Sequence, residues 1–195
     1  VYLGLWTAYS APAPHLKSLP VLDFVASGVG AGLLPFVMGL EVTHQLTPYP
    51  FGLSHHWVRR RYCDALLTAA PLTLFQSGSH IIQAVGDCEA DREAGLRTLP
   101  ARYGRRAGVA LAGSMFLAAV LSPLAYMALG LSSRGYLPWY SVALPFAAPA
   151  LALYRKVLMN PSEGTVANLR KLAVRYGPPT LAAAWIYVLL LRAVL

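Results

Sequence analysis

The stretch that decides the fold covers residues 76–106 and reads QSGSHIIQAVGDCEADREAGLRTLPARYGRR. Its first part is largely apolar, with a few amide and hydroxyl side chains and one histidine. Its second part holds four of the eight acids in the chain within seven residues: Asp87, Glu89, Asp91 and Glu93. Five arginines accompany them: Arg92, Arg97, Arg102, Arg105 and Arg106. The stretch therefore joins an apolar segment to a short, densely charged one.

Five polar side chains of this stretch recur at helical spacing. Gln76, His80, Gln83, Asp87 and Asp91 are separated by 4, 3, 4 and 4 residues, so on a helix they form one stripe. A stripe that faced lipid would leave these groups unsolvated, and we expect it to line a cavity or the interior of a bundle. Interhelical hydrogen bonds within a packed core are the alternative explanation.

The last two members of the stripe, Asp87 and Asp91, are candidate metal ligands. Two like charges on one helix face repel unless a cation lies between them. Mg²⁺ commonly takes one or two carboxylates and completes its shell with substrate phosphates. The neighbouring arginines are suited to the remaining phosphate oxygens. The pattern predicts a metal–phosphate site at the mouth of a pocket, with a plain solvated loop as the alternative.

The composition of the whole chain indicates a lipid environment. Of its 195 residues, 56% are hydrophobic and 12% are charged, and the mean hydropathy is +0.50. Soluble domains carry about 25% charged residues. The net charge of +8 could suggest a nucleic-acid partner. We predict none, because the basic residues lie in short loops between apolar runs, where they orient membrane proteins and bind phosphates.

The apolar runs predict an all-α, multi-span transmembrane helical bundle that forms one domain over residues 1–195. Crossing the hydrocarbon takes roughly 20 apolar residues. Five segments qualify as spans: Val21–Leu40, Cys63–Val85, Ala107–Leu131, Tyr136–Tyr154 and Pro178–Leu195. Val1–Ala8 resembles the tail of a helix, so we expect earlier helices to be missing from the chain. The pair Gly28-x-x-x-Gly32 in the first span predicts close helix packing.

The distribution of basic residues predicts how the bundle is oriented. The set of loops that includes residues 87–106 holds 11 of the 16 Lys and Arg residues, which places it in the cytoplasm and the protein in the cell (inner) membrane. The Glu41–Tyr62 loop is then on the opposite face, although its Arg59-Arg60-Arg61 run disagrees with this orientation. We interpret His44, His55 and His56 in that loop as part of an interfacial belt rather than as a metal site.

A further segment, Glu163–Arg175, has the pattern of a short amphipathic helix. Val166, Leu169, Leu172 and Ala173 are its apolar residues, and Arg170, Lys171 and Arg175 are basic. The pattern predicts contact with anionic lipid headgroups rather than a catalytic role.

Two motifs make the chain resemble a known family. Asp87-x-x-x-Asp91, the following Arg92–Pro100 segment and Tyr103-Gly104 closely resemble the second aspartate-rich motif of the UbiA superfamily of intramembrane prenyltransferases. Upstream, Tyr9–Lys17 resembles that family's loop between its fourth and fifth helices. The order and spacing of the two motifs fit, and the resemblance covers the entire chain as the C-terminal part of such a protein.

The resemblance implies a nine-helix bundle whose central cavity opens laterally to the bilayer. It also implies Mg²⁺-dependent transfer of a prenyl group from its diphosphate to a lipophilic acceptor. Asp87 and Asp91 would be the catalytic, metal-binding pair, and Lys17 and Arg97 would contact the diphosphate. Gln76, His80 and Gln83 would line the substrate pocket.

The chain departs from the family pattern in two ways. It contains no first aspartate-rich motif, since Asp23, Glu41 and Asp64 form no repeated pattern, so we expect the chain by itself to be inactive. His15 occupies a place where related loops often carry a basic residue such as arginine.

The rival hypothesis is a non-catalytic membrane subunit that binds a quinone or pigment, and the intact acid pair favours the enzyme. A phosphotransferase acting on CDP-alcohols would need a longer signature beginning Asp-Gly, which is absent. Quinone precursors, chlorophyll-type acids, tocopherol-type aromatics and carotenoids all stay open as acceptors. The residues from Tyr9 to Asp23 lean towards the carotenoid-modifying members.

Overall fold

The computed structural model describes residues 2–13, 15–39, 55–129, 137–162 and 164–171, and all regular secondary structure within these ranges is helical. The elements in chain order are α1 (Tyr2–Ser10), η1 (Leu16–Ser18), α2 (Leu22–Gly28), η2 (Val29–Leu33), α4 (His55–Gly86), α5 (Cys88–Glu93), α6 (Leu99–Tyr103), α7 (Arg105–Ala128) and α8 (Leu137–Met159). The predicted all-α class is confirmed. The last predicted span, Pro178–Leu195, lies outside the described residues.

Two of the described helical segments are long and apolar enough to cross a membrane, Leu22–Gly39 and Arg105–Ser122. On the second of these segments and just beyond it, the large apolar side chains of Leu117, Leu121 and Leu124 are exposed. They are spaced at 4 and 3 residues and so share one face of α7. An exposed apolar face of this kind suits contact with lipid tails and agrees with a membrane helical bundle.

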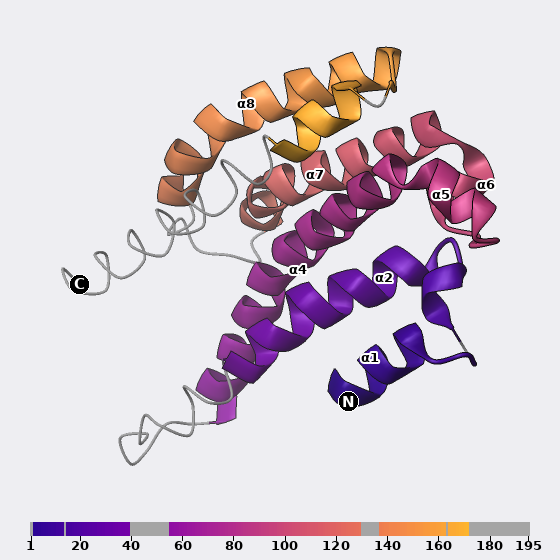
Figure 1. Cartoon of the computed structure of the whole chain (residues 1–195). Coiled ribbons are helices and arrows are strands. Elements are labelled where there is room, and N and C mark those ends of the chain that lie inside the picture. Colours follow the sequence, from indigo (N-terminus) through magenta and orange to yellow (C-terminus); the bar gives the residue numbers. More distant parts are fainter. Residues whose placement is uncertain (1, 14, 40–54, 130–136, 163, 172–195) are drawn as a thin grey trace.

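Helix α4 is the central element, with α2 on one side of it and α7 on the other, and α8 packs against α7 (Figure 1). It begins at His55, eight residues before the start predicted at Cys63. The prediction that His55–Tyr62 belong to a loop was therefore wrong. Hydropathy finds the apolar length that fits the bilayer, whereas a helix can extend beyond it because arginine is a good helix former.

The close helix packing predicted for Gly28 and Gly32 is confirmed. A Cβ atom added to Gly32 would lie 2.8 Å from Cα of Thr73 in α4, and one added to Gly28 would overlap the Ser77 hydroxyl. The absence of side chains at these two positions therefore lets the backbones of α2 and η2 approach α4.

The core joins α4, α7 and α8 and includes a segment that we had expected at the membrane surface. Ile81 and Val85 of α4, Val109 of α7 and Val157 of α8 are fully buried. Residues 164–171 are helical, as predicted, and Val166 and Leu169 of this helix are buried in the same core. Val166 and Leu169 thus pack against protein rather than at a lipid surface, and Leu172 and Ala173 lie outside the described residues.

Candidate functional site

The acid pair lies where α4 gives way to α5. Gly86 ends α4, Asp87 follows in a turn, and α5 begins at Cys88. The helical hydrogen bonds nevertheless continue through the junction. The Asp87 N–H donates to the Gln83 carbonyl at 3.1 Å, and the Asp91 N–H donates to the Asp87 carbonyl at 2.8 Å. Asp87 and Asp91 therefore keep the one-turn relationship that their spacing predicted.

Each acid of the pair has one oxygen engaged by a neighbour. The Thr98 hydroxyl, which is buried, donates a 2.8 Å hydrogen bond to Oδ2 of Asp91. Nη1 of Arg170 lies 3.7 Å from Oδ1 of Asp87. We had expected Arg170 at lipid headgroups, but it contacts the acid pair, and its neighbour Leu169 is buried in the core.

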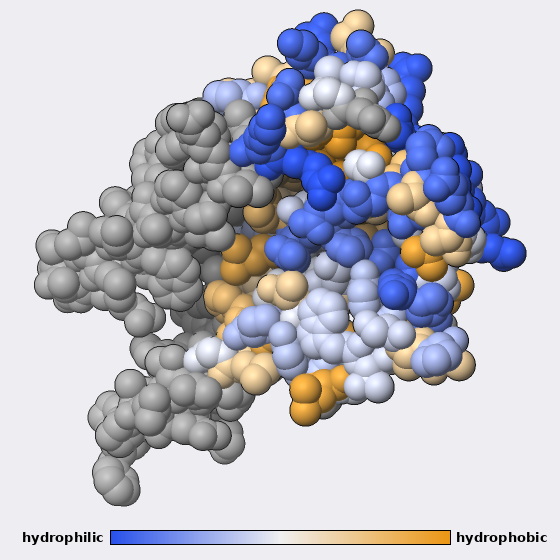
Figure 2. Space-filling model, in the orientation of Figure 1, coloured by the Kyte–Doolittle hydropathy of each residue, from blue (hydrophilic) through white to orange (hydrophobic). Residues whose placement is uncertain are grey.

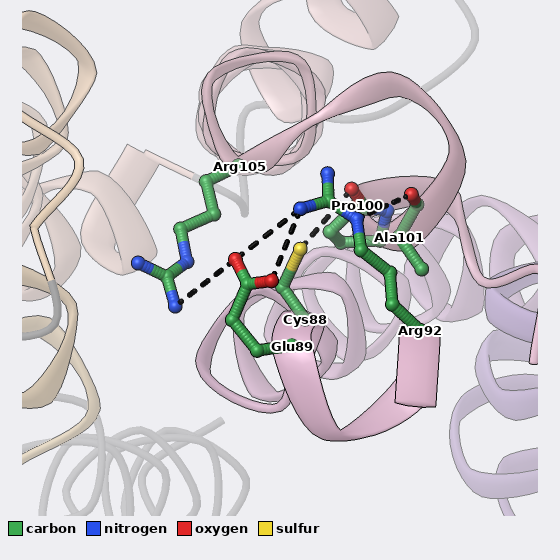
Figure 3. A network of polar contacts seen from close by, with 6 residues as sticks. All are labelled: Cys88, Glu89, Arg92, Pro100, Ala101 and Arg105. Atoms are coloured by element: carbon green, nitrogen blue, oxygen red, sulfur yellow. Dashed lines mark hydrogen bonds and ion pairs between the residues drawn. The ribbon is translucent and has the colours of Figure 1, made fainter. Parts of the chain in front are cut away.

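A network of polar contacts holds α5, α6 and α7 together beside the acid pair (Figure 3). Arg92 donates from Nε to the Ala101 carbonyl at 2.9 Å and from Nη1 to Glu89 at 3.2 Å. Arg105 of α7 lies 3.7 Å from the same glutamate. Two of the arginines that the sequence suggested for phosphate therefore have a structural partner in Glu89.

Cys88 completes this network from the buried side. Its thiol has no exposed surface and donates to the Pro100 carbonyl at 3.3 Å. Burial raises the pKa of the Cys88 thiol, which keeps it protonated and able to donate. The cysteine is therefore a packing and hydrogen-bonding group.

The remaining basic candidates, Arg97 and Lys17, differ in exposure, and Lys17 is half-buried. Arg97 is exposed and lines a shallow depression together with Leu96, Ala101 and Arg102. Lys17 lies in η1, which follows His15 in the left-handed conformation at φ 51° and ψ 56°. Hydrophilic residues gather at the end of the molecule that carries α5 and α6 (Figure 2). This end can offer positive charge to an anionic group.

The stripe on α4 contacts a buried acid that sequence analysis set aside. His80 Nε2 lies 3.0 Å from Oδ1 of Asp23, and the Tyr9 hydroxyl donates to the same oxygen at 2.8 Å. The Asp23 side chain is 5% exposed and that of His80 is 21% exposed. Gln76 is half-buried and Gln83 is exposed. The structure thus brings His80 together with Asp23 and Tyr9. Within the described residues, Gln76 and Gln83 have no side-chain hydrogen-bond partner.

The acid pair alone has too few ligands to enclose a hard cation. Water or phosphate oxygens would have to complete the coordination shell. Among the described residues no three His, Cys, Asp or Glu side chains come close enough to form a closed metal site. Mg²⁺ does not need one, because it typically uses one or two carboxylates and fills its octahedron with water and phosphate oxygens. Thr98 and Arg170 engage one oxygen each, which leaves the second oxygen of Asp87 and of Asp91 for an ion.

The helical fold, with its exposed apolar face on α7, places the chain in the class of membrane helical bundles. The chain belongs to the UbiA prenyltransferase family, whose model matches residues 1–174. It is 30% identical over 162 residues to a lycopene elongase/hydratase of Haloferax volcanii, covering 83% of this chain and 47% of that protein. It is 31% identical over 143 residues to one of Halobacterium salinarum, covering 69% and 44%.

The chain spans about half the length of these curated relatives, or less. No solved structure matches it.

Proposed function

We propose that the protein transfers a prenyl group from its diphosphate to a lipophilic acceptor within the membrane, with Mg²⁺ as the required ion. The observation that carries this proposal is the helical register of Asp87 and Asp91 at the α4–α5 junction. Membership of the UbiA prenyltransferase family supports the reaction class.

Residues of this chain would have the following roles in the reaction. Asp87 and Asp91 bind Mg²⁺, which when bound neutralises charge that develops on the diphosphate leaving group. The Thr98 hydroxyl fixes the orientation of the Asp91 carboxylate. Arg97 and Lys17 bind the diphosphate oxygens, as cations placed at a developing negative charge stabilise the transition state. The apolar helices accommodate the prenyl chain and exclude water from the reacting carbon.

For the acceptor we propose a carotenoid. The relatives from Haloferax volcanii and Halobacterium salinarum are both named lycopene elongase/hydratase. The sequence from Tyr9 to Asp23 also resembles that of the carotenoid-modifying members of the family. The rival function, a non-catalytic subunit that binds a quinone or pigment, gives no reason for two carboxylates one helical turn apart.

The test measures turnover of a labelled prenyl diphosphate with lycopene in membranes that contain the intact protein. Asp87→Ala and Asp91→Ala should each lower turnover by at least about 100-fold, a loss of roughly 2.7 kcal/mol of transition-state stabilisation. Chelation should abolish turnover, and added Mg²⁺ should restore it. Glu93→Ala is the control, because Glu93 is exposed on α5 and lies outside the stripe. If both aspartate variants kept wild-type turnover, the acid pair would be part of a plain solvated loop and would have no role in the reaction.

We also propose that the α5–α6 end lies in the cytoplasm, on the opposite face from Ser54. Single cysteines at Ser54 and Ala101, in a protein without Cys63 and Cys88, can be labelled in intact cells with an impermeant reagent. Labelling at Ser54 alone is expected. Equal labelling of both positions would refute this topology.

A further inference from the structure

In the cluster of Tyr9, Asp23 and His80, the contacts to Asp23 and Tyr9 hold the imidazole ring of His80 in one tautomer, as is typical of a general base. We propose that His80 accepts the proton that the acceptor loses after the prenyl group is attached, with Asp23 and Tyr9 positioning its ring. This inference rests on the proposed function and assigns the second half of that reaction to residues outside the acid pair.

The hydrogen bonds decide which ring nitrogen of His80 is free. Tyr9 donates its one hydroxyl proton to Oδ1 of Asp23. Nε2 of His80 lies 3.0 Å from Oδ1 of Asp23 and 3.2 Å from the Tyr9 oxygen, whose proton is already donated. Both contacts are satisfied when Nε2 carries a proton. The neutral ring then has its lone pair on Nδ1.

Burial and charge keep the cluster in this state. Burial raises the pKa of the Tyr9 phenol, and the nearby carboxylates of Asp23 and Asp91 raise it further, so the phenol remains a donor. Asp23 is 4% exposed and depends on these hydrogen bonds for its solvation. The His80 side chain is 21% exposed, so a ligand can reach its ring.

The position of His80 along α4 fits a role in the second half of the reaction. It precedes Asp87 by seven residues, about two turns or 10 Å along the helix. A diphosphate held by Asp87 and Asp91 would direct its prenyl carbons towards the apolar part of α4, where His80 lies. Trp6, Tyr9 and His80 form a chain of edge-to-face rings with centroid distances of 5.5 and 6.3 Å. Aromatic rings of this kind stabilise nearby cations.

The step balances without any further reagent. The C–O bond of the allylic diphosphate breaks, and pyrophosphate leaves with the electron pair. A double bond of the acceptor supplies two electrons for the new C–C bond, which leaves a cation on the adjacent acceptor carbon. A neighbouring C–H bond then breaks, its electrons form a new double bond, and its proton passes to Nδ1 of His80. The imidazolium later returns the proton to water.

The test separates the two halves of the reaction in membranes that contain the intact protein. Pyrophosphate release reports the first half. The prenyl–lycopene product that has lost its proton, here called the joined product, reports the second half. His80→Gln keeps an amide that can donate to Asp23 but has no base. In this variant the joined product should fall by at least about 100-fold, while pyrophosphate release stays within about threefold of wild type, because the acceptor cation forms before the proton is lost and is captured by water instead.

Asp23→Asn provides a second variant that tests the positioning role. An asparagine amide can donate to Nε2 and so favour the wrong tautomer. It should lower kcat for the joined product and leave the apparent KM for the prenyl diphosphate unchanged. The double variant should be no worse than His80→Gln alone, because residues that act as a unit are not additive. Thermal unfolding in one detergent checks that both variants are folded.

Three outcomes would overturn the inference. Joined product at the wild-type rate from folded His80→Gln would make the cluster a purely structural contact. A parallel loss of pyrophosphate release and joined product would place His80 at the diphosphate end. An Asp23→Asn variant that changes only KM would remove the positioning role. Absence of pyrophosphate release from the wild type itself would instead count against the proposed prenyl transfer.

Discussion

Arg170 and Asp87 form an ion pair, with Nη1 of the arginine 3.7 Å from Oδ1 of the acid. The two residues are 83 positions apart in the sequence and meet because Val166 and Leu169 anchor the helical residues 164–171 in the core. Both side chains are substantially exposed, so the pair contributes little to stability, about 0–1 kcal/mol. Its consequence is functional, since a cation that binds Asp87 must compete with the guanidinium.

Replacement of Arg170 by alanine should therefore lower the Mg²⁺ concentration that gives half-maximal turnover. The expected decrease is up to about fivefold, the equilibrium factor that corresponds to 1 kcal/mol. The measurement is a Mg²⁺ titration of turnover in membranes. Lys171→Ala is the matched control, because it removes one positive charge from the exposed neighbouring residue. Equal midpoints for wild type and both variants would show that Arg170 does not compete with the ion.

Thr98→Val should lower turnover and leave the fold intact. Valine has the shape of threonine without the hydroxyl that donates to Asp91 Oδ2 at 2.8 Å. A hydrogen bond to a charged group contributes about 1.5–3 kcal/mol, so a decrease of about tenfold or more in turnover is expected. Thr98→Ser retains the hydroxyl and should stay close to wild type. If valine and serine behave alike, the bond does not orient the carboxylate.

Gly32→Ala should destabilise the bundle. The added Cβ would lie 2.8 Å from Cα of Thr73, where only a backbone shift can relieve the overlap. The expected cost is about 1–3 kcal/mol, seen as a lower midpoint of thermal unfolding in detergent. Gly4→Ala is the control, because no atom lies within 4 Å of its added Cβ and a helical glycine gains up to about 1 kcal/mol from this change. Equal midpoints for the two variants would contradict the close approach of η2 to α4.

The stability of the protein should depend on Cys88 at alkaline pH. Burial raises the pKa of the Cys88 thiol, so the folded protein holds this proton more tightly than the unfolded chain does. The cysteine therefore leaves the free energy of unfolding unchanged well below the unfolded pKa of about 8.5, and it lowers this free energy as the pH rises above that value.

The measurement is the midpoint of thermal unfolding between about pH 7.5 and 10. Cys88→Ser is the control, since serine keeps a donor for the Pro100 carbonyl and does not titrate in this range. The wild-type midpoint should fall more steeply than that of the serine variant. Parallel curves would show that the thiol keeps its ordinary pKa.

Much of the fold could be predicted from the sequence because the bilayer fixes the length of apolar helices. The helices predicted to start at Ala107 and Tyr136 begin at Arg105 and Leu137. The start of α4 at His55 was missed, because charged residues beyond the hydrocarbon continue a helix without any hydropathy signal. The helix that contains Arg170 was predicted, but the protein partner of its apolar side chains Val166 and Leu169 was not.

Local spacing also determined the one-turn relationship of Asp87 and Asp91, since helical hydrogen bonds connect residues four apart. The buried acid of the His80 cluster could not be found in the same way. Asp23 lies 57 residues from His80, and it stands alone among apolar residues at the start of α2. A lone acid near a helix end is usually solvated, and nothing in the local pattern marks this one as buried.

The sequence by itself thus determined the helical class, the membrane setting and the acid pair, because periodicity and apolar length are local properties of the chain. Only the tertiary structure decided that Asp23 meets His80 and that Arg170 meets Asp87. Those contacts depend on how α2 and the helical residues 164–171 pack against α4. That packing is set by Gly28 and Gly32 on one side and by the burial of Val166 and Leu169 on the other, through contacts between residues distant in the chain.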